Sequence, residues 1–404
     1  MVCKNSVTRL LHLLSLAVVA ALLAACGTLA HKPVPENLAD SAEVLGLVGI
    51  RHWGDEAPLD LEEQAAALME KLRRNYSVTA ETRGPITLDH LALSGGGEDG
   101  AFGAGLLVGW SERGTRPEFQ AVTGISVGAI VAPFAFLGPR YDARLQELLR
   151  AVAQPSRSTP EILAVLFGVS LLDRNPLAPL IKRFITAQMM EEIAREHRKG
   201  RLLRIGTTNL DAGRPVIWDI GKLAASGHPQ ALQMLHKIIL ASSAIPGVFA
   251  PVLFKVDAEG RRFDELHVDG GVTAVVFLYP AQIELREIFA TEPFKQRLFV
   301  IRNGKLDADY DDKVTGLFSI SERAVDTLIR SQGKGDLYKM YVIAQRDGID
   351  YNLAYIPSSF AKQSESLFDK EYMSNLFDLG YDMGRKGYPW FKGPPGIGDH
   401  EYGK

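Results

Sequence analysis

The sequence predicts an α/β fold with a mainly parallel central sheet, and three observations point to it. Short apolar runs of strand length recur along the chain, at residues 91–94, 121–124, 203–208, 216–219 and 298–301. Longer segments of helical character separate them, for example residues 143–152 and 178–195. Neither repeats nor low-complexity stretches interrupt this alternation. Strands that alternate with helices predict a parallel sheet covered on both faces, which is a three-layer α/β/α arrangement.

The composition is that of an ordinary globular protein. The chain has 404 residues, of which 46% are hydrophobic and 23% charged, with a net charge of -3. This length allows a substantial core, and the lack of a basic surplus argues against a nucleic-acid partner. Cys3 and Cys26 are its two cysteines.

The first residues have the pattern of a secretory signal. Lys4 and Arg9 precede an uncharged apolar run over residues 10–25, which ends in Leu-Ala-Ala-Cys-Gly at residues 23–27. These five residues resemble the bacterial lipobox, which implies that residues 1–25 are removed and that Cys26 is lipidated. The chain would then be lipid-anchored in the cell envelope, and Gly27 after the cysteine favours the outer membrane. The alternative is an ordinary signal peptide in which this cysteine has no role.

The remaining chain divides into three parts. Residues 26–85 are expected to form a tether followed by an N-terminal helix, which Asp60 would cap, with apolar residues at helical spacing from Leu61 to Leu72. Residues 86–300 carry the α/β pattern. Residues 301–404 are expected to complete the same domain, with strand-like runs at 341–344 and 352–356, an amphipathic stretch over 367–385 and a flexible end.

A glycine-rich loop follows the first apolar run, in Leu-Ala-Leu-Ser-Gly-Gly-Gly-Glu-Asp-Gly at residues 91–100. Gly95, Gly97 and Gly100 match the dinucleotide-binding pattern G-x-G-x-x-G. That reading requires an acidic residue at the end of the second strand, whereas here Glu118 precedes the strand. Backbone amides of Gly95, Gly96 and Gly97, unobstructed by side chains, suit an oxyanion hole instead, in which one donor is typically worth roughly 3 kcal/mol.

The second strand ends in Gly-Ile-Ser-Val-Gly at residues 124–128, which matches G-x-S-x-G. In a nucleophile elbow the serine lies on a strained turn between strand and helix, and the flanking glycines avoid collisions. Ser126 is therefore a candidate nucleophile, and a chance match on a surface turn is the alternative.

A candidate base for this serine lies in His-Val-Asp-Gly-Gly at residues 267–271. Asp269, followed by two glycines, can be presented on a tight turn at the end of a strand. An Asx-turn without a catalytic role is the alternative.

These segments, together with Thr-Thr-Asn-Leu-Asp-Ala-Gly at 207–213 and Ala-Ser-Ser-Ala-Ile-Pro-Gly-Val-Phe at 241–249, occur in one order along the chain. In that order they resemble the patatin-like phospholipase family over about residues 88–280. The resemblance implies a three-layer α/β fold and a serine–aspartate dyad without histidine, with Ser126 as nucleophile, Asp269 as base and Gly95 to Gly97 as the oxyanion loop. It implies that residues 241–249 pack beside the site, without a catalytic role. It implies neither a metal nor another cofactor.

The chain departs from the family at the glycine loop, where Asp99 stands at the position of a usual basic residue. That change removes any help from a positive side chain and disfavours anionic head groups close by. Among the nine histidines, His90 and His267 are the candidates to turn the dyad into a triad, and packing roles are the preferred interpretation.

The sequence thus predicts a lipid-anchored serine hydrolase that cleaves carboxylic esters of phospholipids or related acyl lipids. A catalytically weak, membrane-tethered lipid-binding protein on the same fold is the alternative. Apolar residues 163–172 are compatible with a lid or acyl wall, or with an ordinary buried helix.

Overall fold

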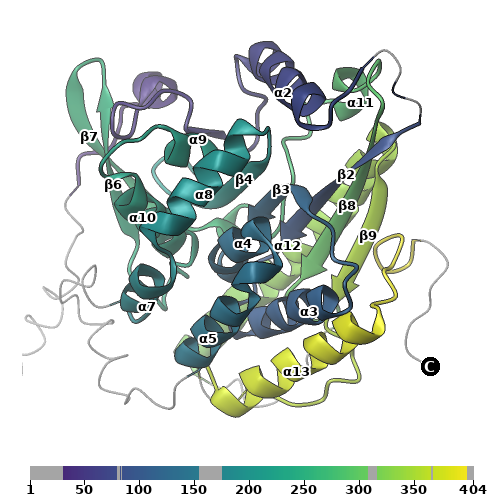
Figure 1. The fold of residues 1–404 in the computed structure, drawn as a ribbon. Helices are drawn as coiled ribbons and strands as arrows, with labels where there is room; N and C mark the ends of the chain where they lie inside the picture. Colours follow the sequence, from purple (N-terminus) through teal and green to yellow (C-terminus); the bar gives the residue numbers. More distant parts are fainter. Residues whose placement is uncertain are drawn as a thin grey trace, which may run out of the picture.

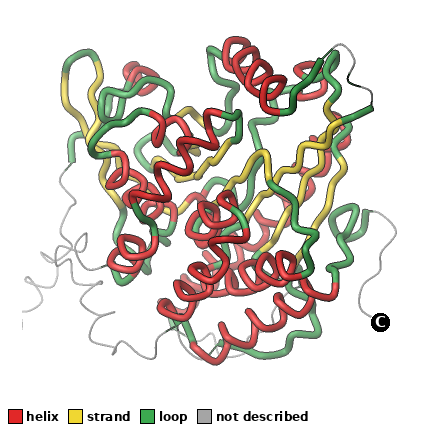
Figure 2. The backbone as a smooth tube through the Cα atoms, viewed as in Figure 1, coloured by secondary structure: helices red, strands yellow, loops and turns green. Residues whose placement is uncertain are grey.

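The computed structural model describes residues 31–79, 82, 84–153, 175–307, 316–364 and 367–397. Its centre is a nine-stranded sheet with helices on both faces, which confirms the predicted α/β class (Figures 1 and 2). Helices α3, α4 and α5 lie in front of the sheet in the view of Figure 1, and α12 lies behind it. The strands are β1 (Arg51–Trp53), β2 (Ile86–Leu93), β3 (Phe119–Gly124), β4 (Leu202–Asn209), β5 (Arg214–Asp219), β6 (Val252–Ala258), β7 (Arg261–Asp269), β8 (Phe294–Arg302) and β9 (Asp350–Tyr355).

The main path of the sheet is β1-β5-β4-β3-β2-β8-β9, and the five consecutive strands from β4 to β9 are parallel. The antiparallel pairs are β1 with β5, β5 with β4, β4 with β7 and β7 with β6. Parallel strands are buried on both faces, which explains why β2 is buried from Leu88 to Leu93 and β3 along its whole length.

The edge of β4 changes partner along its length. Residues 202–205 of β4 pair with β3, which ends at Gly124, and residues 207–209 pair with β7. In this second register Thr207 lies opposite Asp269. The end of β7 therefore lies beside β4 just beyond the point where β3 ends. As a result, the chain after Gly124 and the chain after Asp269 meet at one point of the sheet.

The helices agree with most of the predicted segments. They are α2 (Leu61–Asn75), α3 (Gly100–Glu112), α4 (Val127–Leu137), α5 (Asp142–Val152), α7 (Leu177–Phe184), α8 (Ala187–Arg198), α9 (Ile220–Ala225), α10 (Ala231–Ser242), α11 (Leu285–Ile288), α12 (Leu317–Asp347) and α13 (Lys370–Lys386). The predicted helix over 178–195 is two helices, because the chain is extended at Ile185 and Thr186. The strand expected at 341–344 is wrong: Leu337, Met340 and Ala344 are buried at helical spacing within α12.

The N-terminal segment differs from the expected tether. From His31 onward its described part packs on the sheet: β1 pairs with β5, and Glu43 forms a β-bridge with Asp257 in β6. Helix α2 begins at Leu61 as predicted, but Asp60 does not cap it; Oδ1 of this aspartate accepts a hydrogen bond from Gln64 Nε2 at 2.7 Å instead. Residues 1–30, including Cys26, lie outside the described residues, within which no helix is long and apolar enough to span a membrane.

The C-terminal part of the chain adds a strand and a helix to the same layers. Strand β9 extends the sheet beyond β8, and α13 packs along α3. Glycines allow the backbones of these two helices to approach each other closely. A Cβ on Gly105 would lie 2.1 Å from the carbonyl oxygen of Phe377, and a Cβ on Gly380 would lie 2.2 Å from the carbonyl oxygen of Phe102. The core between these layers includes the fully buried Trp218 and Phe254.

Candidate active site

Ser126 occupies the turn between β3 and α4 in a strained backbone conformation. Its φ is 56° and its ψ is -125°, a backbone conformation that residues other than glycine rarely adopt. The two flanking glycines are needed for space, because a Cβ on Gly124 would lie 2.3 Å from the carbonyl oxygen of Gly128, and a Cβ on Gly128 would lie 2.4 Å from that of Leu93. Strain at a residue held in this way is typical of functional turns. The local geometry is that of a nucleophile elbow.

Two serines at the end of α10 hold the backbone of Ser126 on both sides. Its amide donates to Ser242 Oγ at 2.9 Å, and that hydroxyl donates in turn to the carbonyl of Gly206 in β4 at 2.7 Å. Its carbonyl accepts a hydrogen bond from Ser243 Oγ at 3.3 Å. The segment 241–249, expected only to pack beside the site, thus positions Ser126 directly.

Asp269 ends β7 and is buried beside the elbow. Its amide donates to the carbonyl of Ala244 at 3.0 Å, so the segment that holds Ser126 also holds this residue. Oδ1 accepts the amide of Gly271 at 2.7 Å, whereas Oδ2 is buried without a full hydrogen bond from any described residue.

The surroundings of Asp269 set its proton affinity. Burial raises the pKa of its carboxyl to about 7, although the facing Ser126 hydroxyl and the Gly271 amide lower it. Ser126 and Asp269 are each only 5% exposed. A carboxyl whose pKa is near neutral, facing a serine hydroxyl, is suited to accept that proton.

The glycine loop lies between β2 and α3, next to Ser126. The amide of Gly95 is already engaged, because it donates to the carbonyl of Val275 at 2.9 Å. The amides of Gly96 and Gly97 have no hydrogen-bond partner in the part of the chain that the structure describes. Of the three predicted donors, these two are therefore open in this conformation. Gly96 has φ 154°, and a Cβ there would lie 2.0 Å from the carbonyl oxygen of Asn303, so the loop tolerates no side chain at this position.

Residues at the end of β8 hold the loop in place. Arg302 is buried, and its Nη1 donates to the carbonyl of Gly95 at 2.8 Å and to Ser94 Oγ at 3.1 Å. Asn303 binds Ser94 through its backbone amide, at 2.8 Å from Oγ, and through Nδ2, at 2.9 Å from the carbonyl oxygen. Sequence reasoning missed both residues, since nothing but their position after the apolar run 298–301 marks them. Arg302 thus places a positive charge next to the loop, which has no basic residue of its own.

The acidic pair in the loop is turned toward the C-terminal part of the chain. Asp99 accepts a hydrogen bond from the Tyr372 hydroxyl at 2.5 Å, and Glu98 accepts the amide of Phe368 at 2.8 Å. Burial raises the pKa of Asp99 to about 6, against the hydrogen bond of Tyr372 and the charge of Arg302, which lower it. Asp99 thus has an internal partner on α13.

The two candidate histidines have partners away from the elbow. His267 is fully buried, with its ring nitrogens 2.9 Å from Thr207 Oγ1 and 3.1 Å from Glu265 Oε2. His90 pairs with Gln296 Oε1 at 2.5 Å. Burial lowers the pKa of both, and neither forms a hydrogen bond with Ser126 or Asp269.

Two further expectations concern residues around the site. The segment 163–172 lies outside the described residues, so its role as a lid or wall stays a prediction. In the described ranges, no group of three or more histidine, cysteine, aspartate or glutamate side chains is arranged to hold a metal ion.

Comparisons with known proteins identify the family of the region that contains this site. The family model described as patatin-like phospholipase matches residues 91–281. No sequence of a curated protein matches the chain. Three solved structures resemble the chain, each with a low TM-score. The family assignment therefore rests on the family model alone.

VipD from Legionella pneumophila has 13% identity and a TM-score of 0.32, over 78% of this chain and 72% of that one. ExoU from Pseudomonas aeruginosa, solved in complex with SpcU, has 12% identity and a TM-score of 0.27, over 76% and 52% of the two chains. Human GIVD cytosolic phospholipase A2 has 10% identity and a TM-score of 0.35, over 84% and 56%. The chain thus spans about half the length of the last two. Residues 91–281, which contain the elbow, the glycine loop and Asp269, form a patatin-like phospholipase domain, and at the level of that family this domain is a lipid ester hydrolase.

Proposed function

We propose that the protein is a serine acyl hydrolase in which Ser126 and Asp269 form a catalytic dyad. One observation carries the proposal: the hydroxyl of a serine in a strained elbow faces a buried carboxyl whose pKa is about 7. At neutral pH a substantial fraction of this carboxyl is ionised and can take the serine proton. The substrate class that fits the family is a carboxylic ester of a phospholipid or related acyl lipid.

In the proposed reaction, Ser126 Oγ attacks the ester carbonyl while Asp269 accepts its proton. The negative charge that develops on the carbonyl oxygen is stabilised by the amides of Gly96 and Gly97, while the amide of Gly95 anchors the loop to Val275. Asp269 then protonates the departing alcohol, which leaves an acyl-enzyme. Water, deprotonated by Asp269, hydrolyses the acyl-enzyme and regenerates the serine.

Hydrolysis of a short-chain ester by purified variants tests the dyad. Ser126→Ala and Asp269→Asn should both lose activity by orders of magnitude, because residues that act as one unit fail together. His267→Gln and His90→Gln should keep most activity, since no imidazole takes the proton. Each variant is checked for a cooperative melt. Ser226→Ala, at an exposed serine after α9, is the matched control and should behave as wild type.

Two outcomes would contradict this assignment. A folded histidine variant as inactive as Ser126→Ala would show a triad instead of a dyad. Inactivity of the wild-type protein toward esters, with saturable binding of the same lipids, would favour the weak lipid-binding alternative.

We also propose that the chain is anchored in the bacterial cell envelope through lipidated Cys26, with the body outside the bilayer. The lipobox-like residues 23–27 support this. Cys26→Ser should leave an uncleaved precursor or release a soluble form on cell fractionation. A processed Cys26→Ser protein that still sediments with membranes would contradict the anchor without affecting the dyad.

A further inference from the structure

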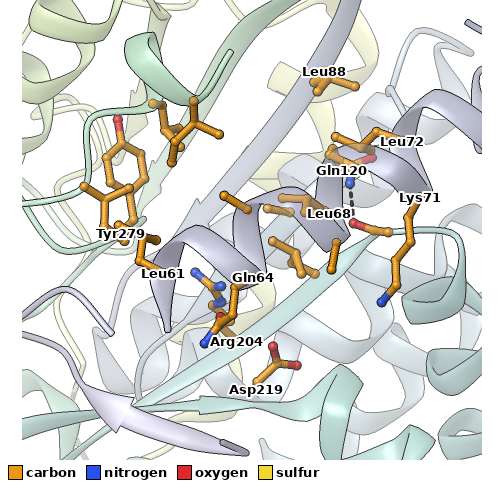
Figure 3. Close-up of a pocket in the computed structure, with 18 of the residues that line it drawn as sticks. Leu61, Gln64, Leu68, Lys71, Leu72, Leu88, Gln120, Arg204, Asp219 and Tyr279 are labelled. Atoms are coloured by element: carbon orange, nitrogen blue, oxygen red, sulfur yellow. Dashed lines mark hydrogen bonds between the residues drawn. The ribbon is translucent and has the colours of Figure 1, made fainter. Parts of the chain in front are cut away.

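A cavity that is distinct from the elbow lies between α2 and the central sheet (Figure 3). It has a volume of about 400 Å³ and is lined from the sheet side by Leu88, Gln120 and Arg204, in β2, β3 and β4. Gln120 lies near the start of β3, whereas Ser126 follows its end, so the cavity and the elbow lie at opposite ends of this strand. The cavity is therefore separate from the catalytic machinery.

Most of the cavity wall is apolar. Helix α2 presents one row of leucines to it, and the segment before β8 closes another side. The principal apolar residues are Leu61, Leu68, Leu72, Leu88, Leu278 and Phe289. A volume near the lower end of the range for small-molecule sites, about 300–1,000 Å³, suits one aliphatic chain better than a two-chain lipid.

The polar part of the wall contains an arginine without a hydrogen bond. The Nε of Arg204 is buried and unpartnered, and the guanidinium makes neither a hydrogen bond nor a close ion pair with any described residue. Asp219, which also lines the cavity, is the acidic residue whose charge acts on Arg204; its Oδ1 accepts a hydrogen bond from the amide of Lys222 at 2.8 Å. Burial lowers the pKa of Arg204, although the charge of Asp219 raises it. An arginine enclosed in this way has donors to offer to a ligand.

Other groups around Arg204 set the charge of the cavity. Lys71 and Lys222 add two positive charges to the lining, and Glu63 and Asp219 add two negative ones. The buried His197 is held neutral, because desolvation lowers its pKa. With Arg204 included, the excess is one positive charge, which matches a monoanion and disfavours a dianionic phosphate.

We propose that this cavity binds a single-chain fatty carboxylate. The carboxylate accepts two hydrogen bonds from the fork of Arg204, the pairing that guanidinium geometry favours, and the alkyl chain lies along the leucines of α2. This site does not depend on the dyad, because the bound molecule is a free acid and no bond is made or broken.

Cysteine protection locates the ligand, because the chain has only two cysteines, Cys3 and Cys26. The full chain with both changed to serine receives Leu68→Cys in the cavity wall, or Ala66→Cys on the exposed face of the same helix as the matched control. Dodecanoate below its micelle concentration should slow maleimide labelling of the Leu68→Cys protein roughly tenfold or more. It should leave labelling of the Ala66→Cys protein unchanged.

The contribution of the arginine is measured with a second ligand and a second substitution. Dodecanol, which has the chain without the charge, should protect at least about tenfold less well, because a charged hydrogen bond is lost. Arg204→Met, added to Leu68→Cys, should reduce the protection that dodecanoate gives against maleimide to the level of the protection by dodecanol. Hydrolysis of a short-chain ester, tested in wild type and Arg204→Met, should not change.

Three results would overturn the proposal. They are no protection by dodecanoate in a cooperatively melting Leu68→Cys protein, equal protection by dodecanoate and dodecanol, and equal dodecanoate protection with and without Arg204→Met. The comparison of the two ligands needs no change at Arg204, so the proposal remains testable even if Arg204→Met fails to fold.

Discussion

Asp269→Asn removes the charge of a buried carboxyl while keeping its shape, and its effect on stability should depend on pH. The amide oxygen can keep the hydrogen bond from the Gly271 amide, and the amide nitrogen replaces Oδ2, which has no full hydrogen bond among the described residues. In the wild-type protein, burial raises the pKa of this carboxyl from 3.8 to about 7. Ionised Asp269 therefore opposes folding.

The size of this effect follows from the two pKa values. Between them, the folded state holds a proton that the unfolded state has lost, so the free energy of unfolding falls as pH rises. Each pKa unit corresponds to about 1.4 kcal/mol, so the full penalty above pH 7 is about 4 kcal/mol. Between pH 5 and pH 8 the penalty grows by about 3 kcal/mol. Asp269→Asn lacks this term, so relative to wild type it should gain stability by that amount over the interval.

Urea denaturation of both proteins at pH 5 and pH 8 measures the difference. All other titrating groups are shared, so their contributions cancel in the comparison. The Asp269→Asn protein should gain about 3 kcal/mol relative to wild type between the two pH values while remaining inactive toward esters. A difference in stability that stays constant with pH would refute the elevated pKa and with it the basis for the base role.

Further predictions concern the groups around the dyad. The kcat/KM for a short-chain ester should rise with pH through an apparent pKa of about 7, because Asp269 must be ionised, and a flat profile from pH 5 to 8 would contradict this. Ser242→Ala leaves the Ser126 amide without its acceptor, so it should cost about 1–3 kcal/mol in urea denaturation and lower kcat. Gly128→Ala should destabilise by about 3 kcal/mol or more, because its Cβ would collide with the carbonyl at the end of β2, and a wild-type melting temperature would contradict that contact. Arg302→Met should lower kcat roughly tenfold to hundredfold with little change in KM, since it loosens the loop that carries the oxyanion donors.

Much of the fold is predictable from the sequence, because its central strands are buried on both faces. Their apolar runs at 203–208 and 298–301 mark β4 and β8, although not their full lengths. The runs at 341–344 and 178–195 show the limit of this reasoning. A short apolar run in a long helix has no period of its own, and a break at Ile185 leaves no proline or glycine as a signal.

The candidate site, like the fold, is only partly predictable from the sequence. Ser126, Asp269 and the glycine loop are visible in the sequence, because tight backbone geometry requires glycine beside each of them. The hydrogen bond that the Ser126 amide donates to Ser242, and the one that Arg302 donates to the loop, depend on long-range packing between segments more than 100 residues apart. The amide of Gly95 is engaged for the same reason, since its acceptor, Val275, lies after β7.

The reactivity of Ser126 tests the central claim most directly. A fluorophosphonate reacts with an activated serine and not with an ordinary hydroxyl, and mass spectrometry of the digested protein locates the adduct. We predict one adduct on the peptide that contains Ser126 in the wild type and in Ser226→Ala, and none in a folded Ser126→Ala protein. Absence of labelling in the wild type beside a labelled serine hydrolase, or an adduct at another serine, would contradict the account.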